Sequence, residues 1–303
     1  MDNRKSIRPR RSMDRISPSE GDDRGSIPRE GTSETHNALH CDAQSEVPQR
    51  TPLNNMHKET RWLLEEKYHG TETPEFFADL KRLEAGEPLA YVIGWTDFLG
   101  CHIDLSAHPL IPRPETEFWV EQVIRSQQSV VNDQKTNILD LFSGSGCIGI
   151  ALAKHLPNTT VDFGEKDPKF CEQIAKNITA NNIAINQTRV IQTDVFSRIT
   201  DSYDYIFANP PYIDPTKKAT VEESVLRHEP HGALFAGSGG LTFITQLLAE
   251  ARAHLHQGGI LMIEFGANQK EDIARLARAH SWNIEFEKDQ FGEWRIATLR
   301  PRP

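Results

Sequence analysis

The sequence predicts an α/β fold built on a doubly wound, mostly parallel sheet of seven strands. Apolar, strand-like runs alternate with helical stretches from Asn137 to the C-terminus, and this alternation is typical of parallel sheets. A glycine-rich turn at residues 143–149 follows the first of these runs, and a proline-rich turn at residues 209–212 follows the fourth. In such sheets ligands bind at the carboxyl ends of the strands, so both turns are expected to border one crevice.

The composition indicates a globular protein with an acid excess. The chain has 303 residues and a formal net charge of −9, which argues against binding that relies on neutralising nucleic-acid phosphates. No apolar stretch reaches the roughly 18–20 residues of a membrane helix. The four cysteines are scattered and the histidines form no metal-binding pattern. We therefore expect a reduced compartment with no disulfide, no metal and no membrane association.

Residues 1–55 predict a disordered tail, because they contain no Phe, Trp or Tyr and few large apolar residues. The first 15 residues are rich in arginine, as in organelle transit peptides. Acidic residues return by Glu20, so a targeting segment and a plain solvated tail both fit this stretch.

Residues 56–87 predict a small helical module. The stretch from Trp62 to Tyr68 forms one short helix, and apolar residues from Phe76 to Leu83 recur at spacings of three and four in a second. Pro74 suits the first turn of that second helix and Gly86 ends it.

Residues 88–112 predict a β-hairpin linker. The runs Tyr91–Ile93, Phe98–Leu99 and Cys101–Leu105 read as strands, with glycine turns between them. Residues 113–303 form the third domain, which opens with a helix over residues 115–124. Its expected strands are Ile138–Phe142, Thr160–Gly164, Thr188–Thr193, Tyr203–Ala208, Gly259–Phe265, Asn283–Glu287 and Arg295–Leu299.

The glycine-rich turn has the spacing of a nucleotide-binding loop. Gly144, Gly146 and Gly149 satisfy the G-x-G-x-x-G pattern, and Glu165 ends the next strand 21 residues after Gly144. This combination is the fingerprint of dinucleotide binding. Any adenosine-containing cofactor uses the same close backbone approach and the same acid on its ribose, so the loop alone leaves dinucleotide and nucleoside cofactors open.

Two further strand ends favour the nucleoside. Asp194 ends the third strand, where it can accept from an adenine amino group, although a strand-end cap also fits. Asn209-Pro-Pro-Tyr212 ends the fourth strand. Its prolines fix the backbone, so its oxygens can accept both N–H bonds of a planar NH₂ group. A dehydrogenase has no use for that loop.

Six segments carry a resemblance to a known family, and the resemblance covers roughly residues 57–300. They are Pro88-Leu-Ala-Tyr-Val-Ile-Gly94, Ile111-Pro-Arg-Pro-Glu-Thr-Glu117, Asp140-Leu-Phe-Ser-Gly-Ser-Gly146, Asn209-Pro-Pro-Tyr212, Glu229-Pro-His-Gly-Ala-Leu234 and Gly239-Gly-Leu241. With them the chain resembles the class I S-adenosylmethionine-dependent methyltransferases that modify a glutamine of peptide-chain release factors. The resemblance implies that fold, S-adenosylmethionine as cofactor, and a helical domain that recognises the substrate.

The resemblance also implies residue roles. Asn209 and Pro210 would accept the two hydrogens of the substrate amide and Tyr212 would stack on it, which makes these three the catalytic set. Substrate binding adds Pro211, Arg113 and Glu115. The positions that match the cofactor site are Phe142, Ser143, Gly144, Ser145, Gly146, Glu165, Asp194, Val195 and Asn209. Phe142-Ser143, Glu165 and Val195 depart from the residues more usual in the family.

The implied activity is methyl transfer from S-adenosylmethionine to the N5 atom of the glutamine in the Gly-Gly-Gln loop of a release factor, a step in translation termination. One alternative is a DNA or RNA amino-methyltransferase acting on N6 of adenine or N4 of cytosine, which would need a target-reading domain and a basic groove. Another is a non-catalytic, S-adenosylmethionine-binding protein of translation. We expect a monomer, with no sequence-specific nucleic-acid binding. Its location is expected to be mitochondrial, or cytoplasmic if the tail is not a targeting segment.

Overall fold

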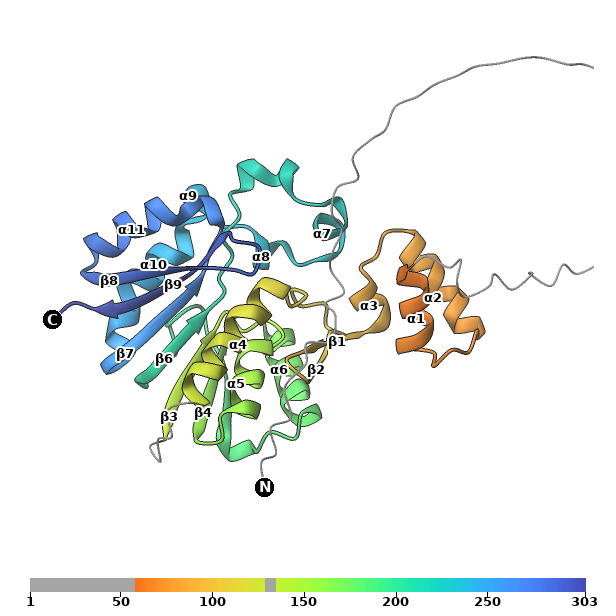
Figure 1. Cartoon of the computed structure of the whole chain (residues 1–303), viewed down its shortest axis with the longest axis horizontal. Helices are drawn as coiled ribbons and strands as arrows, with labels where there is room; N and C mark the ends of the chain where they lie inside the picture. The colour runs from red at the N-terminus through yellow and green to blue at the C-terminus, as the bar shows by residue number, and fades with distance from the viewer. Residues whose placement is uncertain (1–57, 129–134) are drawn as a thin grey trace, which may run out of the picture.

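A computed structural model describes residues 58–128 and 135–303, so the expected tail and its targeting segment lie outside the described residues. A seven-stranded sheet has the order β5-β4-β3-β6-β7-β9-β8 (Figure 1). The seven strands expected in residues 113–303 are all confirmed. Their bounds are β3 (Thr136–Leu141), β4 (Thr159–Glu165), β5 (Thr188–Gln192), β6 (Tyr203–Ala208), β7 (Leu255–Glu264), β8 (Trp282–Lys288) and β9 (Trp294–Pro301).

The sheet has its topological switch point between β3 and β6. The chain runs outward from β3 through β4 to β5 and then returns to β6 on the other side of β3. These strands and β7 are parallel, and β9 is antiparallel to both of its neighbours. Leu141 of β3 pairs with Ala208 of β6, so the glycine-rich loop and the Asn-Pro-Pro-Tyr loop leave adjacent strands at the same edge. This is the place where open α/β sheets bind ligands.

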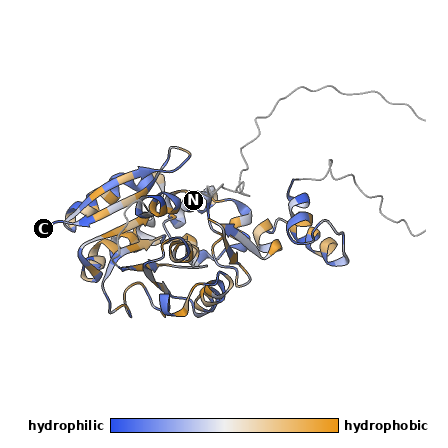
Figure 2. Ribbon diagram, turned by 60° about the horizontal axis from the view of Figure 1, so that its bottom comes forward, coloured by the Kyte–Doolittle hydropathy of each residue, from blue (hydrophilic) through white to orange (hydrophobic). Residues whose placement is uncertain are grey.

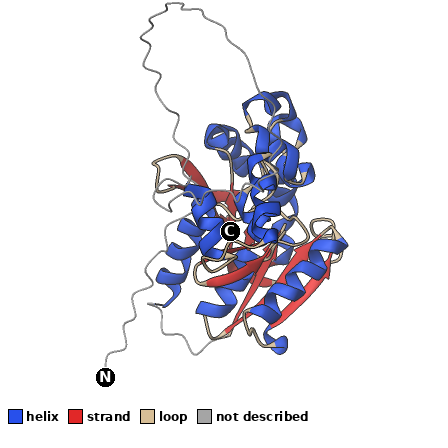
Figure 3. Cartoon of the chain, turned by 90° about the vertical axis from the view of Figure 1, so that its right-hand side faces the viewer, coloured by secondary structure: helices blue, strands red, loops and turns tan. Residues whose placement is uncertain are grey.

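Helices cover both faces of the sheet, which confirms the doubly wound fold (Figure 3). A separate hydrophobic core lies on each face of the sheet. Consecutive residues of a strand point to opposite faces, so Ile138 of β3 belongs to one core and Leu139 to the other. Helices α4 (Pro114–Gln128), α5 (Cys147–His155) and α6 (Pro168–Ala180) pack on one face, and α10 (Thr242–Glu250) and α11 (Lys270–Ala279) on the other. Hydrophobic residues gather where helices meet strands (Figure 2), and their removal from water is the main stabilising contribution.

Three N-terminal helices form a core of their own beside the sheet (Figure 1). They are α1 (Lys58–Glu66), α2 (Pro74–Glu84) and α3 (Leu89–Ile93), which bury Leu63, Leu64, Phe76, Leu89, Val92 and Ile93 together. The prediction of a strand at Tyr91–Ile93 is therefore wrong. This short apolar run instead makes one helical turn, because it completes the core of the other two helices and ends at Gly94, whose φ is +98°. The division into domains itself stays a prediction.

The expected hairpin consists of β1 (Trp95–Phe98) and β2 (Cys101–Asp104). Two asparagines of α6 hold its second strand. Asn181 Oδ1 accepts from the amide of His102 at 2.9 Å, and Asn177 Oδ1 accepts from that of Asp104 at 2.8 Å. Asn177 Nδ2 also donates to the carbonyl of Ser145 at 2.9 Å. A single buried amide thus connects the hairpin to the glycine-rich loop.

Short helices fill the connections. Between β6 and β7 lie η3 (Pro215–Thr220), α7 (Glu223–His228), α8 (His231–Leu234) and α9 (Gly237–Gly240), followed after α10 by η4 (Ala251–His254). The others are η2 (Ile185–Gln187) and η5 (Ala267–Gln269). Within the described parts of the chain, none of the helices has the length and apolar character to cross a membrane.

Candidate active site

Two cavities meet at the carboxyl edge of the sheet. The first, of about 700 Å³, is lined by residues 142–145, Glu165, Asp194 and Val195, and is called here the glycine-loop cavity. The second, of about 1010 Å³, lies between the N-terminal helices and the residues around Tyr212, and is called the module cavity. Asn209 lines both. A ligand in either cavity can therefore contact the Asn209 side chain.

The glycine-rich loop turns sharply out of β3. Phe142 has a φ of +61°, a left-handed conformation that is uncommon for a non-glycine residue, and its ring packs edge-on against Phe243. A Cβ atom added at Gly144 would meet no atom within 4 Å, so the loop leaves room for a ligand. Gly146 caps α5 with a φ of +80° and, unlike residues 142–145, does not line the cavity.

Glu165 lies beneath this loop with its carboxylate held by three backbone amides. Oε2 accepts from Gly144 at 2.9 Å, while Oε1 accepts from Lys166 at 2.7 Å and from Asp167 at 2.9 Å. A carboxylate has about four acceptor positions, so roughly one stays available on Oε2 for a ribose hydroxyl. Glu165 is thus placed both to shape the loop and to contact a ligand.

Asp194 and Val195 border the far side of the same cavity. Asp194 Oδ2 pairs with Lys166 Nζ at 2.8 Å, and the Asp194 side chain is 55% exposed. Val195 is buried with a φ of +49°. Lys166 lines the cavity as well, so an adenine amino group at Asp194 would share that carboxylate with the lysine.

The Asn-Pro-Pro-Tyr loop is fastened by residues that the sequence reasoning missed. Gln269 Nε2 donates to the Tyr212 carbonyl at 2.9 Å and to that of Gly239 at 3.1 Å. Tyr212 lines the module cavity, and burial raises the pKa of its hydroxyl. Pro211 lines the glycine-loop cavity, whereas Pro210 is buried and belongs to neither lining. The loop thus contributes Asn209 to both cavities, Pro211 to the glycine-loop cavity and Tyr212 to the module cavity.

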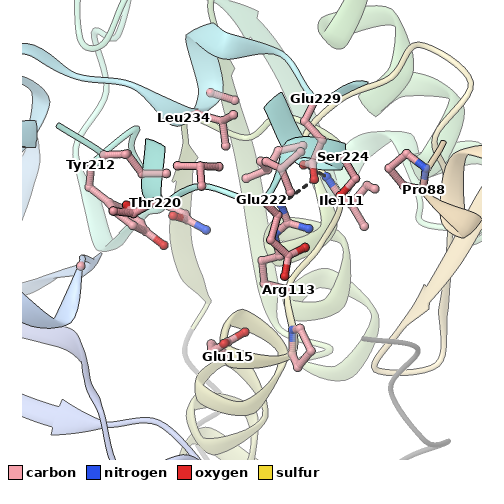
Figure 4. A pocket seen from close by; sticks show the side chains of 18 of the residues that line it. Pro88, Ile111, Arg113, Glu115, Tyr212, Thr220, Glu222, Ser224, Glu229 and Leu234 are labelled. Atoms are coloured by element: carbon pink, nitrogen blue, oxygen red, sulfur yellow. Dashed lines mark hydrogen bonds and ion pairs between the residues drawn. The ribbon is translucent and has the colours of Figure 1, made fainter. Parts of the chain in front are cut away.

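Arg113 lines both cavities and is held there by Glu229. In the sequence analysis Glu229 appears only as part of the Glu229–Leu234 segment and has no role. Arg113 Nη2 lies 2.6 Å from Glu229 Oε1, and the Glu229 side chain is 1% exposed. Glu229 Oε2 also accepts from the amide of Ile111 at 3.2 Å. Figure 4 shows this pair, with Glu115 at the start of α4 and Tyr212 across the cavity. The segment before α4 is thereby tied to the chain after β6.

Replacing Gly240 by alanine is expected to displace the Asn-Pro-Pro-Tyr loop. The new Cβ would lie 2.0 Å from the Tyr212 carbonyl oxygen, and such overpacking typically costs about 1–3 kcal/mol. Gly239→Ala is the matched control, because Gly239 shares the left-handed backbone but has open space around it. Thermal unfolding should show Gly240→Ala as clearly the less stable variant; equal melting temperatures would contradict the close contact.

Asp140 gives the protein a pH-sensitive point beneath the glycine-rich loop. Its Oδ2 accepts from Gly149 at 2.9 Å, while Oδ1 has no hydrogen-bond partner among the described residues. Burial raises the pKa of Asp140 to about 7. Because the pKa is raised on folding, the contribution of Asp140 to stability is greatest at low pH and is lost as the pH rises through 7.

We expect this loss to reach about 1.4 kcal/mol between pH 6 and pH 8, the equivalent of one pKa unit. Urea unfolding at both pH values, in the unmodified protein and in Asp140→Asn, measures it. The Asp140→Asn variant should lose the corresponding part of the pH dependence. An identical pH dependence in both proteins would show that Asp140 is ionised throughout this range.

Comparisons with known proteins agree with this architecture. The Methyltransferase small domain family model matches residues 126–237. The release factor glutamine methyltransferase of Streptococcus pneumoniae is 32% identical over 78% of this chain and 83% of its own length. This chain belongs to the release factor glutamine methyltransferase family. The family member of Salmonella typhimurium is 33% identical over 74% of this chain and 79% of its own length.

A solved structure supports the fold independently. The hMettl16 catalytic domain in complex with the MAT2A 3'UTR hairpin 6 superimposes with a TM-score of 0.53 and 18% identity, over 67% of this chain and 76% of that chain. As a family member the chain is a methyltransferase with S-adenosylmethionine as its cofactor. The glycine-loop cavity fits such a cofactor, because it combines open space at Gly144 with the carboxylates of Glu165 and Asp194.

Proposed function

We propose that this protein methylates the N5 atom of the glutamine in the Gly-Gly-Gln loop of a peptide-chain release factor. Asn209 carries the proposal, since it is the Asn-Pro-Pro-Tyr residue that lines both cavities. A substrate amide in the module cavity and a methyl donor in the glycine-loop cavity would meet at this side chain.

The reaction requires positioning rather than strong acid–base chemistry. The bound cofactor supplies an electrophilic methyl group on a sulfonium, whereas a carboxamide nitrogen is a poor nucleophile. Asn209 Oδ1 accepts one amide hydrogen and the Pro210 carbonyl the other, and these bonds strengthen as the nitrogen begins to bond carbon. Because Pro210 lines neither cavity, the substrate amide would have to reach its carbonyl from beside Asn209.

As the N–C bond forms, the bond from the methyl group to sulfur breaks, and the sulfide product, S-adenosylhomocysteine, would leave. The methylated nitrogen is acidic, so its surplus proton can pass to solvent after the transfer and no strong general base is needed. Tyr212 covers the amide and excludes water.

The remaining assigned residues order the two ligands. Arg113, fixed by Glu229, and Glu115 border the substrate side, where Glu115 lines the module cavity. Glu165 would hold the ribose of the cofactor and Asp194 its adenine amino group, with Phe142 and Val195 as apolar residues of the same cavity lining. Helix α2 contributes Leu83 to the module cavity, and the turn between α2 and α3 contributes Gly86 and Glu87, which supports a role for residues 56–87 in recognising the protein substrate.

A transfer assay with labelled S-adenosylmethionine tests the proposal. The substrates are a release factor, the same factor with the Gly-Gly-Gln glutamine changed to alanine, and unmethylated duplex DNA. We expect label on the unmodified release factor only. Label on DNA alone would replace the protein substrate with a nucleobase and overturn the proposal.

The proposal includes a mitochondrial location and a monomeric state. The mitochondrial location rests on the basic residues 1–15, and the relatives named above are bacterial proteins. Fluorescent fusions with and without residues 1–55 test it, because only the full chain should then enter mitochondria. The monomeric state is tested by light scattering, and the lack of specific nucleic-acid binding by the DNA arm of the assay above.

A further inference from the structure

A buried carboxylate lies directly beside the Asn-Pro-Pro-Tyr loop and has no part in the proposed reaction. Glu264 ends β7 and is 1% exposed. In the register of the sheet Ala208 pairs with Ile263, so the next residues of the two strands, Asn209 and Glu264, leave the edge together. A carboxylate buried this deeply is costly unless it is well hydrogen-bonded, so its partners indicate what it does there.

Glu264 takes two hydrogen bonds on one oxygen from the start of α4. Its Oε2 accepts from Thr116 Oγ1 at 2.7 Å and from Trp119 Nε1 at 2.9 Å. Because the Thr116 hydroxyl and the Trp119 indole both donate to Oε2, a proton on this carboxyl would lie on Oε1, which the Tyr212 hydroxyl faces at 3.5 Å, and Oε2 stays an acceptor. Burial raises the pKa of Glu264, and this leaves the role of Oε2 unchanged.

The Thr116 hydroxyl has one proton, and the use of that proton determines whether its oxygen can donate or only accept a further hydrogen bond. A hydroxyl has one donor position and two acceptor lone pairs, and the donor position is used on Glu264. Toward Asn209 the Thr116 oxygen can therefore only accept. Asn209 Nδ2 is the group that faces it, at 3.4 Å. This bond is long, as catalytic contacts in ligand-free enzymes often are, but its direction follows from the proton count.

The direction matters because an asparagine amide has two orientations of nearly equal shape. With Nδ2 toward Thr116, Oδ1 occupies the other corner of the amide. The reversed amide would set Oδ1 against an oxygen that has no proton to give, and would present N–H groups where the proposed function needs an acceptor. The buried glutamate thus selects one amide orientation through the threonine.

We propose that Thr116 and Glu264 are positioning residues that hold the Asn209 amide with Oδ1 free to accept from the substrate amide. The proposal rests on the proposed function, because it assigns Asn209 Oδ1 the acceptor role. It adds two residues from outside the four-residue loop, one at the first turn of α4 and one at the end of β7.

Thr116→Val is the decisive variant, because it keeps the side-chain shape and removes the hydroxyl. We expect kcat with a release factor to fall by roughly tenfold to hundredfold, since the amide loses its preferred orientation and a buried polar group loses its partner. Thr116 lines the glycine-loop cavity, but valine keeps the shape of its side chain, so the dissociation constant of S-adenosylmethionine should change by less than about twofold. Thr116→Ser restores the hydroxyl and should recover most of the lost kcat.

Glu264 offers an independent pair of variants. Glu264→Gln can place its carbonyl oxygen where Oε2 lies, because Trp119 and Thr116 both donate to that point, so it should keep most of the activity. Glu264→Leu removes the acceptor and should lower kcat as Thr116→Val does. Thr179→Val is the control, since the Thr179 hydroxyl bonds only to Ala175 within helix α6. Melting curves of each variant identify any failure to fold.

The outcomes separate this proposal from the proposed function. If the unmodified protein transfers methyl to the release factor and Thr116→Val does so at the same kcat, the positioning role is wrong and the function stands. If Thr116→Ser is as impaired as Thr116→Val, packing and not the hydroxyl is responsible, and the role is again overturned. If the unmodified protein methylates no release factor, the proposed function fails first and this role with it.

Discussion

Replacing Asn209 by alanine is expected to lower kcat by roughly 10²–10³-fold or more. The side-chain oxygen accepts a hydrogen bond that strengthens only as the methyl group is transferred, and a preorganised polar group of this kind contributes about that factor. Binding of S-adenosylmethionine should stay within about twofold, because the polar contacts of the cofactor are assigned to Glu165 and Asp194, and Asn209 supplies only part of the lining of the glycine-loop cavity. Single-turnover transfer and calorimetric cofactor titration give the two quantities separately.

Asn268→Ala is the matched control for that experiment. Asn268 lines the module cavity beside Gly266 but has no assigned role, so its loss should fall within the roughly 0.5 kcal/mol typical of neutral positions. Retained transfer in Asn209→Ala would refute the acceptor role. A large loss in both variants would instead indicate that any asparagine in this cavity is needed for substrate docking.

The strands were predictable because a sheet covered on both faces reads as apolar runs. Tyr203–Ala208 is predicted to the residue, and it lies at the centre of the sheet between β3 and β7. The predicted bounds of a strand are less accurate where its residues are less buried. Strand β7 begins at Leu255, four residues before the expected Gly259, because its first part carries exposed polar residues and glycines that leave no apolar signal.

Tyr91–Ile93 shows where local pattern stops being sufficient. A three-residue apolar run fits a strand and a helical turn equally well, and the choice was made by the apolar side chains of α1 and α2 that it covers. The site residues also differ in how far the sequence could predict them. The motifs that were found are continuous in the chain, whereas Thr116 and Glu264 are 148 positions apart and meet only because α4 packs beside the β6–β7 edge.

A signal for Glu264 was nevertheless present in the sequence. It is a lone acid at the end of an otherwise apolar predicted strand, Gly259–Phe265, and a buried charge in such a place requires partners. The partner Thr116 belongs to the Ile111–Glu117 segment, already singled out for its resemblance. What the sequence lacks is the strand order, which alone puts β7 next to β6.

Replacing Glu165 by alanine is expected to weaken S-adenosylmethionine binding by about 100-fold. The carboxylate has two tasks, since it holds the amides of Gly144, Lys166 and Asp167 and keeps roughly one acceptor position for the ribose. Hydrogen bonds to a charged group contribute about 1.5–3 kcal/mol each, so loss of the ribose contact with loosening of the loop accounts for that factor. Calorimetric titration with the cofactor measures the change.

Glu172→Ala is the control, because Glu172 is an exposed residue of the neighbouring helix α6. Glu165→Asp separates the two tasks of Glu165. Its shorter carboxylate would have to give up either the loop amides or the ribose, so an intermediate dissociation constant is expected. An unchanged dissociation constant in Glu165→Ala would remove Glu165 from the cofactor site altogether.

The Glu165 and Asn209 variants together test whether the two cavities act independently. Glu165 belongs to the lining of the glycine-loop cavity alone, whereas Asn209 belongs to both. Glu165→Ala should therefore recover a normal kcat once the cofactor concentration is raised to saturation, and Asn209→Ala should not recover at any concentration. Failure of Glu165→Ala to recover would mean that the loop it holds also sets the geometry at Asn209, through the adjacent ends of β3 and β6.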